Sequence, residues 1–407
     1  MNCRHCDVAL RHSFLDLGHA PPSNAYLTEA DLARPERYYP LRLWVCEHCW
    51  LVQTDDYTEA GELFAADYAY FSSTSSGWLA HARDYAVRMR SMLALQADSL
   101  VIEVAANDGY LLRNFVAAGV PCLGIEPTAS TADAAERLGI PVLREFFGEA
   151  LGVQLAKEGQ QADLLIGNNV FAHVPDINDF SRGLKALLKP GGTLTLEFPH
   201  LLRLIELVQF DTVYHEHFSY LSLYSVQRIL SAAGLRIHDV EELATHGGSL
   251  RIFACHEDDP RSQAASVEAV LQAEARAGLR DLTTYRGFQA RADRVKDDLL
   301  SFLLEQKRAG RRVAAYGAAA KGNTILNYAG VRPDLLPWVF DAAPSKQGKY
   351  LPGSHIPIRS PENLDEIRPD LLLILPWNIA EEVMAQNDRI RQWGGRFVIA
   401  VPELEVV

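Results

Sequence analysis

Side chains suited to proton transfer are concentrated in one short segment of the 407-residue chain. Residues 214–220 read Tyr-His-Glu-His-Phe-Ser-Tyr, which brings together two imidazoles, a carboxylate and two phenols. Such groups serve as general acids and bases in enzymes. The spacing is not His-Glu-x-x-His, and ligands on adjacent residues do not easily converge on one ion, so proton transfer is favoured over metal binding. A purely structural cluster is the alternative interpretation.

Four cysteines near the N-terminus form a second group. They stand as two Cys-x-x-Cys pairs, Cys3 with Cys6 and Cys46 with Cys49. Four thiolates complete a tetrahedral shell and leave no position for water, so the spacing predicts a structural Zn²⁺ site. A redox pair and a nucleic-acid-reading ribbon are the alternatives. The formal net charge of −13 argues against binding of nucleic acid.

A third candidate is the turn that follows an apolar run at 100–104. It reads Glu103-Val-Ala-Ala-Asn-Asp-Gly109, and Glu126 ends the next apolar run. Because Ala105 and Asn107 stand where a dinucleotide fingerprint has glycines, the turn favours a cofactor without phosphate, such as S-adenosylmethionine. Glu103 is then expected to hold the amino group and Glu126 the ribose. The alternative is an α/β domain that binds nothing at this edge.

Other polar side chains are expected to face the same cleft. Asn168, Asn169 and His173 follow another strand, and the carboxyl ends of parallel strands line the ligand crevice of an open sheet. An isolated histidine is, however, often a satisfied core residue. His246 and Ser249 bracket a Gly-Gly turn at the same edge, although its glycines can serve the turn alone.

Two further segments have a functional and a structural interpretation. Tyr68 and Tyr70 precede the helix expected at 78–95, where aromatic residues more often build core than perform chemistry. Residues 317–324 read Gly-Ala-Ala-Ala-Lys-Gly-Asn-Thr, which is similar to a phosphate loop but lacks the Lys-Ser/Thr ending. Lys321 at this helix start is expected either to hold a diphosphate or simply to cap the helix.

The elements that must position these groups alternate between strand and helix. This order predicts an α/β fold with a doubly wound parallel sheet. The last two strands are joined by a short turn at 246–249 and are expected to form an antiparallel hairpin, as in a Rossmann-like methyltransferase domain. The predicted strands are 100–104, 120–126, 142–143, 164–166, 193–197, 235–240 and 250–254.

Length and composition complete the predicted organisation. The pattern predicts a zinc-binding module at 1–65, a methyltransferase domain at 66–255, and a helical connector with a smaller α/β domain at 256–407. The chain contains no run of about 18 apolar residues and begins without an apolar signal segment, so we expect a cytoplasmic protein that binds neither membrane nor nucleic acid.

Seven ordered motifs together resemble the nucleotide-sugar C-methyltransferases, which methylate C-3 of 4-keto-6-deoxyhexoses. The resemblance covers nearly the whole chain. It departs at Ala105, where the family usually keeps a glycine. Besides the four cysteines, the motifs are Tyr-x-Tyr-Phe-Ser-Ser at 68–73, Asn-Asp-Gly-Tyr-Leu-Leu at 107–112, Phe-Ala-His-Val-Pro-Asp at 171–176, residues 214–220, His-Gly-Gly-Ser-Leu-Arg at 246–251, and residues 316–324.

The resemblance implies a substrate and a mechanism. The substrate is a nucleoside-diphosphate 4-keto-sugar, and a base removes its C-3 proton to give an enolate that takes up the methyl group of S-adenosylmethionine. His217 matches the family's base, and Tyr214 and Glu216 match its partners. His173 and either Tyr68 or Tyr70 contact the sugar.

The remaining residues of the expected site divide between cofactor and substrate. The expected cofactor-binding residues are Glu103, Ala105, Asn107, Asp108, Gly109, Glu126, Pro127, Asn168 and Asn169, and the expected substrate-binding residues are His246, Ser249, Lys321 and Asn323. We expect a monomer. Two other hypotheses are an O- or N-methyltransferase of another small metabolite, and a zinc-ribbon adaptor without catalytic activity.

Overall fold

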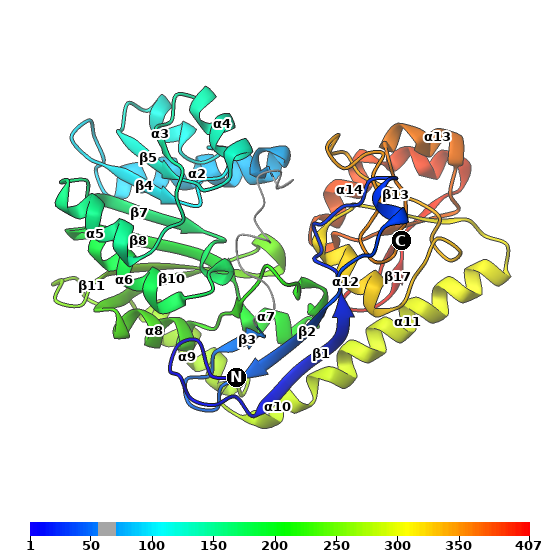
Figure 1. Ribbon diagram of the computed structural model, residues 1–407, viewed down its shortest axis with the longest axis horizontal. Helices are drawn as coiled ribbons and strands as arrows, with labels where there is room; N and C mark the ends of the chain where they lie inside the picture. Colours follow the sequence, from blue (N-terminus) through cyan, green and yellow to red (C-terminus); the bar gives the residue numbers. More distant parts are fainter. Residues whose placement is uncertain (56–70) are drawn as a thin grey trace.

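A four-stranded antiparallel sheet carries the N-terminal cysteines. The structure is a computed structural model that describes residues 1–55 and 71–407. The sheet has the order β1-β2-β3-β9, so that a short strand from the middle of the chain completes it. Figure 1 shows β1 and β2 passing between the two larger α/β bodies. The strands are β1 His12–Ala20, β2 Tyr39–Val45, β3 Val52–Thr54 and β9 Ser219–Tyr220.

The central sheet has seven strands in the order β10-β11-β8-β7-β4-β5-β6. The pairs from β8 to β6 are parallel, and β11 is antiparallel to both of its neighbours. The predicted doubly wound fold and its terminal antiparallel hairpin are therefore confirmed. The strands are β4 Val101–Val104, β5 Cys122–Ile125, β6 Val142–Leu143, β7 Ala162–Asn168, β8 Leu188–Pro199, β10 Leu235–Leu243 and β11 Ser249–His256.

Helices cover both faces of this sheet because its inner strands are apolar on both sides. Along β4, Ile102 and Val104 pack on the side of α5, α6, α8 and α9, whereas Val101 packs on the side of α2, α3 and α4. The helices of this part are α2 Ser76–Met92, α3 Arg113–Ala117, α4 Ala129–Arg137, α5 Glu149–Lys157, α6 Ile177–Leu187, α7 Leu201–Glu206 and α8 Leu223–Ala232.

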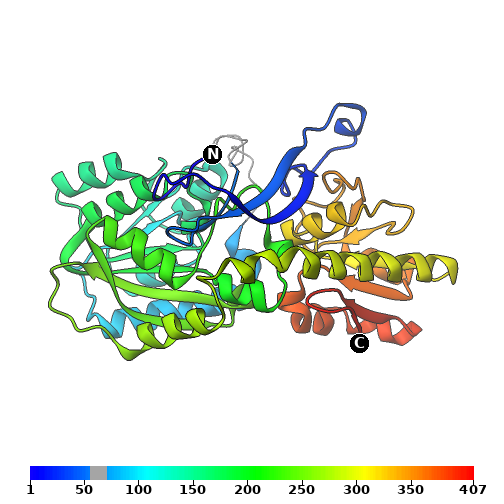
Figure 2. The same ribbon diagram turned by 90° about the horizontal axis from the view of Figure 1, so that it is seen from below.

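The C-terminal sheet has the order β14-β13-β12-β15-β16-β17, with only β17 antiparallel to its neighbour. The long helix α11 runs from the central part of the molecule along this sheet (Figure 2). The strands are β12 Val313–Tyr316, β13 Val339–Phe340, β14 Ile358–Arg359, β15 Leu371–Ile374, β16 Arg396–Ile399 and β17 Glu405–Val406. The helices are α9 Ala265–Arg276, α10 Leu282–Arg286, α11 Phe288–Arg308, α12 Ala320–Tyr328, α13 Leu364–Ile367 and α14 Ala380–Gln386.

One hydrophobic core joins the N-terminal sheet, the C-terminal sheet and helices α7, α11 and α12. It contains Phe14 of β1, Leu201 of α7, Leu299 of α11 and Val313 of β12, all of them buried. The N-terminal strands thus act as a wedge that both α/β bodies contact. The division of the chain at residues 65 and 255 stays a prediction.

Candidate active site

The four N-terminal cysteines converge as a metal site requires. Their Sγ atoms all lie within 4.8 Å of one another, and three of the four side chains are buried. Cys3 and Cys49 are 3.4 Å apart, and Cys6 and Cys46 are 3.5 Å apart. Four sulfur ligands fit a tetrahedral Zn²⁺ ion whose role is structural, since they leave no open coordination position. In the described part of the chain, no other group of three or more possible ligands lies this close together.

The cysteine module is joined directly to the proton-transfer segment. Strand β3 follows Cys49 and pairs with β9, which begins two residues after His217, and Gln53 lies opposite Ser219. The Thr54 amide donates to the Phe218 carbonyl over 3.1 Å. A metal that orders the knuckle at 46–49 therefore also orders the backbone beside His217.

Buried acceptors without donors are gathered at the carboxyl edge of β4 and β7. Glu103 is 1% exposed, and neither of its carboxylate oxygens has a hydrogen-bond partner among the described residues. One side-chain oxygen on each of Asp108, Asn168 and Asn169 is also buried without a hydrogen-bond partner among the described residues. Burial and the charges of Asp108 and Glu126 raise the pKa of Glu103 well above its usual value. Buried polar groups are normally paired, so this edge fits a ligand that brings donors.

These orphaned acceptors match the donors of S-adenosylmethionine. Its ammonium group and its ribose hydroxyls offer N–H and O–H donors, and it carries no phosphate. Glu126 faces the same turn, but its two oxygens already accept from the Asn107 and Thr128 amides, each over 2.9 Å. A carboxylate oxygen has two lone pairs, so Glu126 retains acceptor capacity for a ribose. Pro127 is half-buried between these contacts.

The cofactor turn needs backbone conformations that glycine adopts most easily. Ala105 has φ +58° and Asn107 has φ +51°, both in the left-handed region. An alanine there costs about 1–2 kcal/mol relative to ordinary backbone. The turn therefore keeps its required shape with Ala105 at an energetic cost. Gly109 is required for a second reason, because a Cβ at that position would come within 2.4 Å of Ile140.

His217 is buried, and its ring is oriented by one hydrogen bond. Its Nδ1 lies 3.0 Å from the Thr212 carbonyl oxygen. A carbonyl only accepts, so Nδ1 carries the proton and the neutral ring keeps its lone pair on Nε2. Burial, followed by the neighbouring His173, lowers the pKa of His217 well below its usual value. The ring is thus neutral at physiological pH.

Aromatic and imidazole rings surround His217. The ring centroids of Tyr214 and His173 lie 4.0 Å and 4.6 Å from that of His217. Burial lowers the pKa of His173 to about 4, against a smaller opposing effect of the Glu216 backbone. His173 is the last residue of η3 Phe171–His173. The Phe218 amide donates to the Ala172 carbonyl over 2.8 Å, and this hydrogen bond holds η3 beside the segment that carries His217.

The other two members of the segment point in different directions. Glu216 accepts from Asn24 Nδ2 over 2.7 Å, so its partner comes from the N-terminal strand module. His215 Nε2 lies 3.3 Å from the Tyr39 carbonyl on β2. His215 and His217 therefore do not converge on one ion, which agrees with the preference for proton transfer over metal binding.

Lys321 enters the site from the C-terminal domain. Its Nζ donates to Asn378 Oδ1 over 2.8 Å and lies 4.6 Å from the centre of the Trp377 ring. Burial lowers the pKa of Lys321 to about 8, although the charge of Asp211 opposes this effect. The Lys321 charge also lowers the pKa of His217 and of His246, so that all three belong to one electrostatic neighbourhood.

The remaining substrate candidates differ in what they contact. His246 Nε2 accepts from the Asn169 amide over 3.3 Å, and its ring centroid is 5.0 Å from that of Trp78, so it lies between the cofactor edge and α2. Ser249 instead donates to the Thr245 carbonyl within its own turn. Asn323 donates to the Ser23 carbonyl, a contact that docks α12 on the N-terminal module. Tyr68 and Tyr70 lie outside the described residues.

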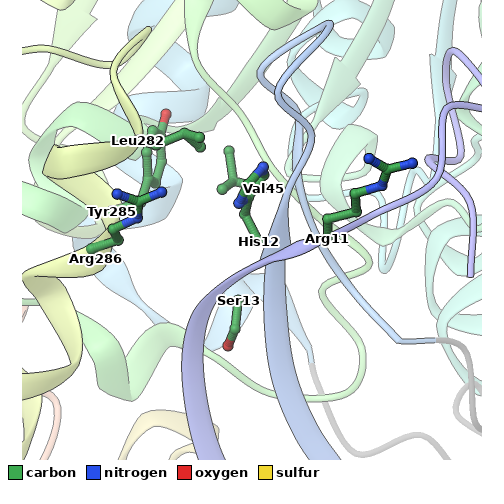
Figure 3. Close-up of a pocket in the computed structure, with 7 residues that line it drawn as sticks. All are labelled: Arg11, His12, Ser13, Val45, Leu282, Tyr285 and Arg286. Carbon is green, nitrogen blue, oxygen red and sulfur yellow. The ribbon is translucent and has the colours of Figure 1, made fainter.

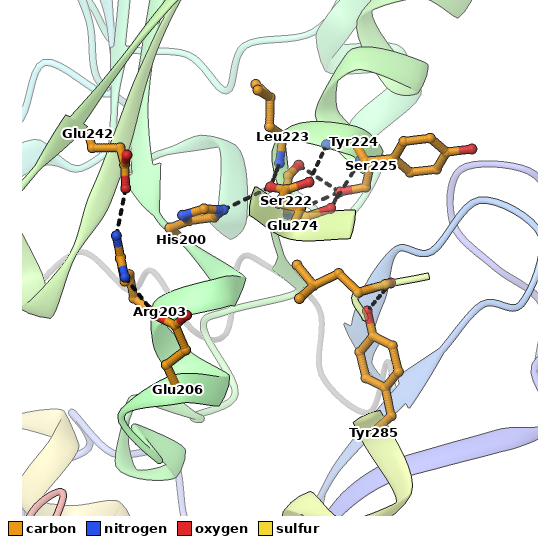
Figure 4. A network of polar contacts seen from close by, with 11 residues as sticks. His200, Arg203, Glu206, Ser222, Leu223, Tyr224, Ser225, Glu242, Glu274 and Tyr285 are labelled. Carbon is orange, nitrogen blue, oxygen red and sulfur yellow. Dashed lines mark hydrogen bonds and ion pairs between the residues drawn. The ribbon is translucent and has the colours of Figure 1, made fainter. Parts of the chain in front are cut away.

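The ends of the segment that carries His217 are joined at its base (Figure 4). His200 bridges Leu221, and the buried carboxylate of Glu274 from α9 binds both sides of this junction. One Glu274 oxygen is 2.8 Å from His200 Nε2 and 2.5 Å from the Leu223 amide, and the other accepts from the Tyr224 amide over 3.0 Å. The two ends of the segment at 201–221 are therefore held together, which fixes where this segment begins and ends.

Several of these residues were not predicted from the sequence. Trp78, Asp211 and Trp377 carry no motif spacing, and of the three only Trp78 lies in a helix that the sequence analysis named, the one expected at 78–95. A pocket of about 230 Å³ between β1, β2 and α10 contains no candidate residue (Figure 3). Its lining is Arg11, His12, Ser13, Val45, Leu282, Tyr285 and Arg286.

Comparison with known proteins decides the family. The chain is 34% identical over 405 residues to the C-methyltransferase NovU of Streptomyces niveus, covering 99% of this chain and 96% of that protein. This chain belongs to the C-methyltransferase family. Family models match it as "Putative zinc binding domain" over 3–64, "Methyltransferase domain" over 70–240 and "C-methyltransferase C-terminal domain" over 244–402.

Other matches cover only part of the chain. An uncharacterised methyltransferase of Mycobacterium leprae is 28% identical over 99 residues, 24% of this chain and 36% of that protein. Among solved structures, magnesium protoporphyrin IX methyltransferase from Synechocystis PCC 6803 is 17% identical with a TM-score of 0.36, covering 44% of this chain and 83% of that chain.

The C-methyltransferase depends on S-adenosylmethionine and has a zinc-binding domain, as predicted. It is an enzyme, so the non-catalytic adaptor is excluded. Among its described residues, none of the helices combines the length and the apolar character that crossing a bilayer requires.

The Glu103 carboxylate, which has no hydrogen-bond partner among the described residues, provides a test of the cofactor site. We expect Glu103→Gln to weaken S-adenosylmethionine binding by about 10- to 100-fold, because a charged hydrogen bond contributes about 1.5–3 kcal/mol. Without cofactor, the same variant should melt at a higher temperature than the unaltered enzyme. The reason is that the variant no longer buries a carboxylate that has no hydrogen-bond partner. Calorimetric titration and thermal unfolding measure the two effects. Glu305→Gln on the exposed surface of α11 is the control, and equal affinity in both variants would contradict the assignment of Glu103.

Proposed function

We propose that the enzyme methylates C-3 of a nucleoside-diphosphate 4-keto-6-deoxyhexose through an enolate. The observation that carries this proposal is the state of His217, a buried neutral imidazole whose proton is held on Nδ1 by the Thr212 carbonyl. Carbon is not nucleophilic until a proton is removed, so a C-methyltransferase needs a base of this kind. The full-length similarity to NovU, itself called a C-methyltransferase, supports transfer to carbon.

In the proposed reaction His217 Nε2 takes the proton from C-3. The C–H electron pair forms the enolate double bond, and the negative charge moves to the former ketone oxygen. S-adenosylmethionine, when bound by Glu103, Glu126 and the turn at 105–109, would supply an electrophilic methyl group to the enolate carbon, its sulfur keeping the electron pair of the broken S–CH3 bond in S-adenosylhomocysteine. The protonated His217 is neighboured by Tyr214, whereas Glu216, the carboxylate of the same segment, accepts a hydrogen bond from Asn24.

The sugar is proposed to lie between His173, His217 and His246. Lys321 is proposed to bind the substrate with its cationic amine, which is charged below pH of about 8. In this arrangement the C-terminal domain takes part in nucleotide-sugar binding. We also propose that the enzyme acts as a monomer. The four thiolates of the zinc site are consistent with a cytoplasmic enzyme, because they need reducing conditions.

Exchange of the C-3 proton tests the proposed function. We expect the enzyme, incubated with the 4-keto-sugar nucleotide in D₂O together with S-adenosylhomocysteine, to replace the C-3 proton by deuterium without methyl transfer. Proton NMR follows the loss of the C-3 signal. Heat-inactivated enzyme and the His217→Asn variant control for the spontaneous exchange of a ketone. If the active enzyme exchanges no faster than these controls, or methylates oxygen or nitrogen instead, the proposed reaction is wrong.

A further inference from the structure

The carbonyl that orients His217 belongs to a short segment with two neighbours in the C-terminal domain. Thr212 ends η4 Phe210–Thr212 and is buried, as are Asp211 and Val213 on either side of it. Trp377 Nε1 donates to Asp211 Oδ2 over 2.7 Å, and Thr324 Oγ1 donates to the Val213 carbonyl over 2.8 Å. Both flanking residues of Thr212 are therefore bound by side chains that lie more than a hundred positions away in the sequence.

The indole that binds Asp211 has two further close contacts. Its ring packs against the Gly247 backbone so closely that a Cβ at that glycine would come within 2.3 Å of the ring. The Lys321 ammonium lies over the same ring at 4.6 Å and is bonded to the adjacent Asn378. Trp377 thus contacts both the turn that carries His246 and the cation of α12.

Asp211 is a buried carboxylate whose presence needs an explanation. It is 1% exposed, and its Oδ1 has no partner among the described residues. Burial raises its pKa to about 6, against the opposing charge of Lys321. Burying a carboxylate costs free energy, which an apolar side chain would avoid. The hydrogen bond from Trp377 gives the buried carboxylate a purpose, because it holds Asp211 in position.

We propose that Trp377 and Asp211 are positioning residues through which the C-terminal domain sets the tautomer and orientation of His217. Trp377 holds Asp211, Thr324 holds Val213, and the Thr212 carbonyl between them accepts the Nδ1 proton of His217. The lone pair of the ring is thereby kept on Nε2. The proposal rests on the proposed function only in taking His217 as the base, since the orientation itself is a property of the protein without substrate.

The tautomer of His217 provides a readout that does not depend on the reaction. We expect long-range ¹H–¹⁵N spectra of ¹⁵N-histidine-labelled enzyme to show His217 protonated on Nδ1, its signals being assigned by their loss in His217→Asn. Trp377→Phe keeps an aromatic ring but removes the indole N–H, and should shift His217 toward a mixture of tautomers. Trp393→Phe is the matched control, because Trp393 donates the same kind of bond to the Pro369 carbonyl within the C-terminal domain.

Kinetics separate positioning from simple destabilisation. We expect Trp377→Phe to lower kcat by about tenfold while KM for both substrates and the melting temperature stay close to those of Trp393→Phe. Asp211→Asn retains an acceptor oxygen and should keep most of the activity that Asp211→Ala loses. If Trp377→Phe unfolds, Thr324→Val tests the second contact in the same spectra.

The outcomes that overturn the proposal are distinct from those that overturn the proposed function. An unchanged His217 tautomer in both Trp377→Phe and Thr324→Val, or equal activity of Asp211→Asn and Asp211→Ala, contradicts the positioning role. A changed tautomer in an enzyme that does not exchange the sugar C-3 proton contradicts only the proposed reaction.

Discussion

Replacement of His217 by asparagine is expected to lower the rate of methyl transfer by about 10²–10⁴-fold, the usual contribution of a general base. The variant is well matched to the geometry, because the asparagine amide can still donate to the Thr212 carbonyl from the position of Nδ1, which is 3.0 Å away in the enzyme. Only the Nε2 lone pair is lost. The loss should therefore appear in kcat, with little change in the fold of the loop.

Calorimetry distinguishes a chemical effect of His217→Asn from a structural one. The variant should bind S-adenosylmethionine as tightly as the enzyme does, because the cofactor acceptors lie on β4, β5 and β7. His215→Asn is the control, since His215 is a neighbouring buried imidazole that contacts the Tyr39 carbonyl instead. Near-normal turnover by His217→Asn would show that another group removes the proton.

Loss of the metal is expected to have the second large effect. We expect Cys46→Ser to abolish stoichiometric zinc binding and to reduce methyl transfer below detection. Structural zinc contributes about 10–16 kcal/mol to the folding of small zinc modules, which is comparable to the whole stability of a domain. The damage should reach the active site because β3, next to the zinc knuckle, pairs with β9 immediately after His217.

Zinc content, thermal unfolding and activity have to be measured together for this variant. Cys122→Ala is the control, since Cys122 is a buried cysteine of β5 that lies outside the cluster, and it should retain zinc and activity. A zinc-free Cys46→Ser enzyme with native activity would contradict the structural role of the metal and its connection to His217.

Most of the local chemistry was predictable from residue types and short spacings. Cys-x-x-Cys brings two thiolates together within a single turn, so the zinc site needed only the two pairs to meet. The alternation of apolar runs with helices predicted the central sheet, and the carboxyl-edge rule then placed Glu103, Glu126 and Asn169 near one another. The prediction of the sheet and of its terminal hairpin is confirmed.

The orientation of individual side chains was not predictable from spacing. His215 and His217 are two residues apart, yet one contacts β2 and the other the Thr212 carbonyl. In a loop without regular secondary structure there is no period from which the direction of a side chain follows. The partner of Glu216 is likewise Asn24, which lies in an irregular part of the N-terminal module.

The sequence alone therefore determined which groups are available for chemistry: four thiolates, a cofactor turn with its acidic residues, and a cluster of bases. Only the tertiary structure decided which of these groups meet. The contact of Trp377 with Asp211 joins residues 166 positions apart, and the pairing of β3 with β9 joins segments equally remote in the chain. Such contacts depend on the packing of whole domains around one shared core, which no local pattern of residues records.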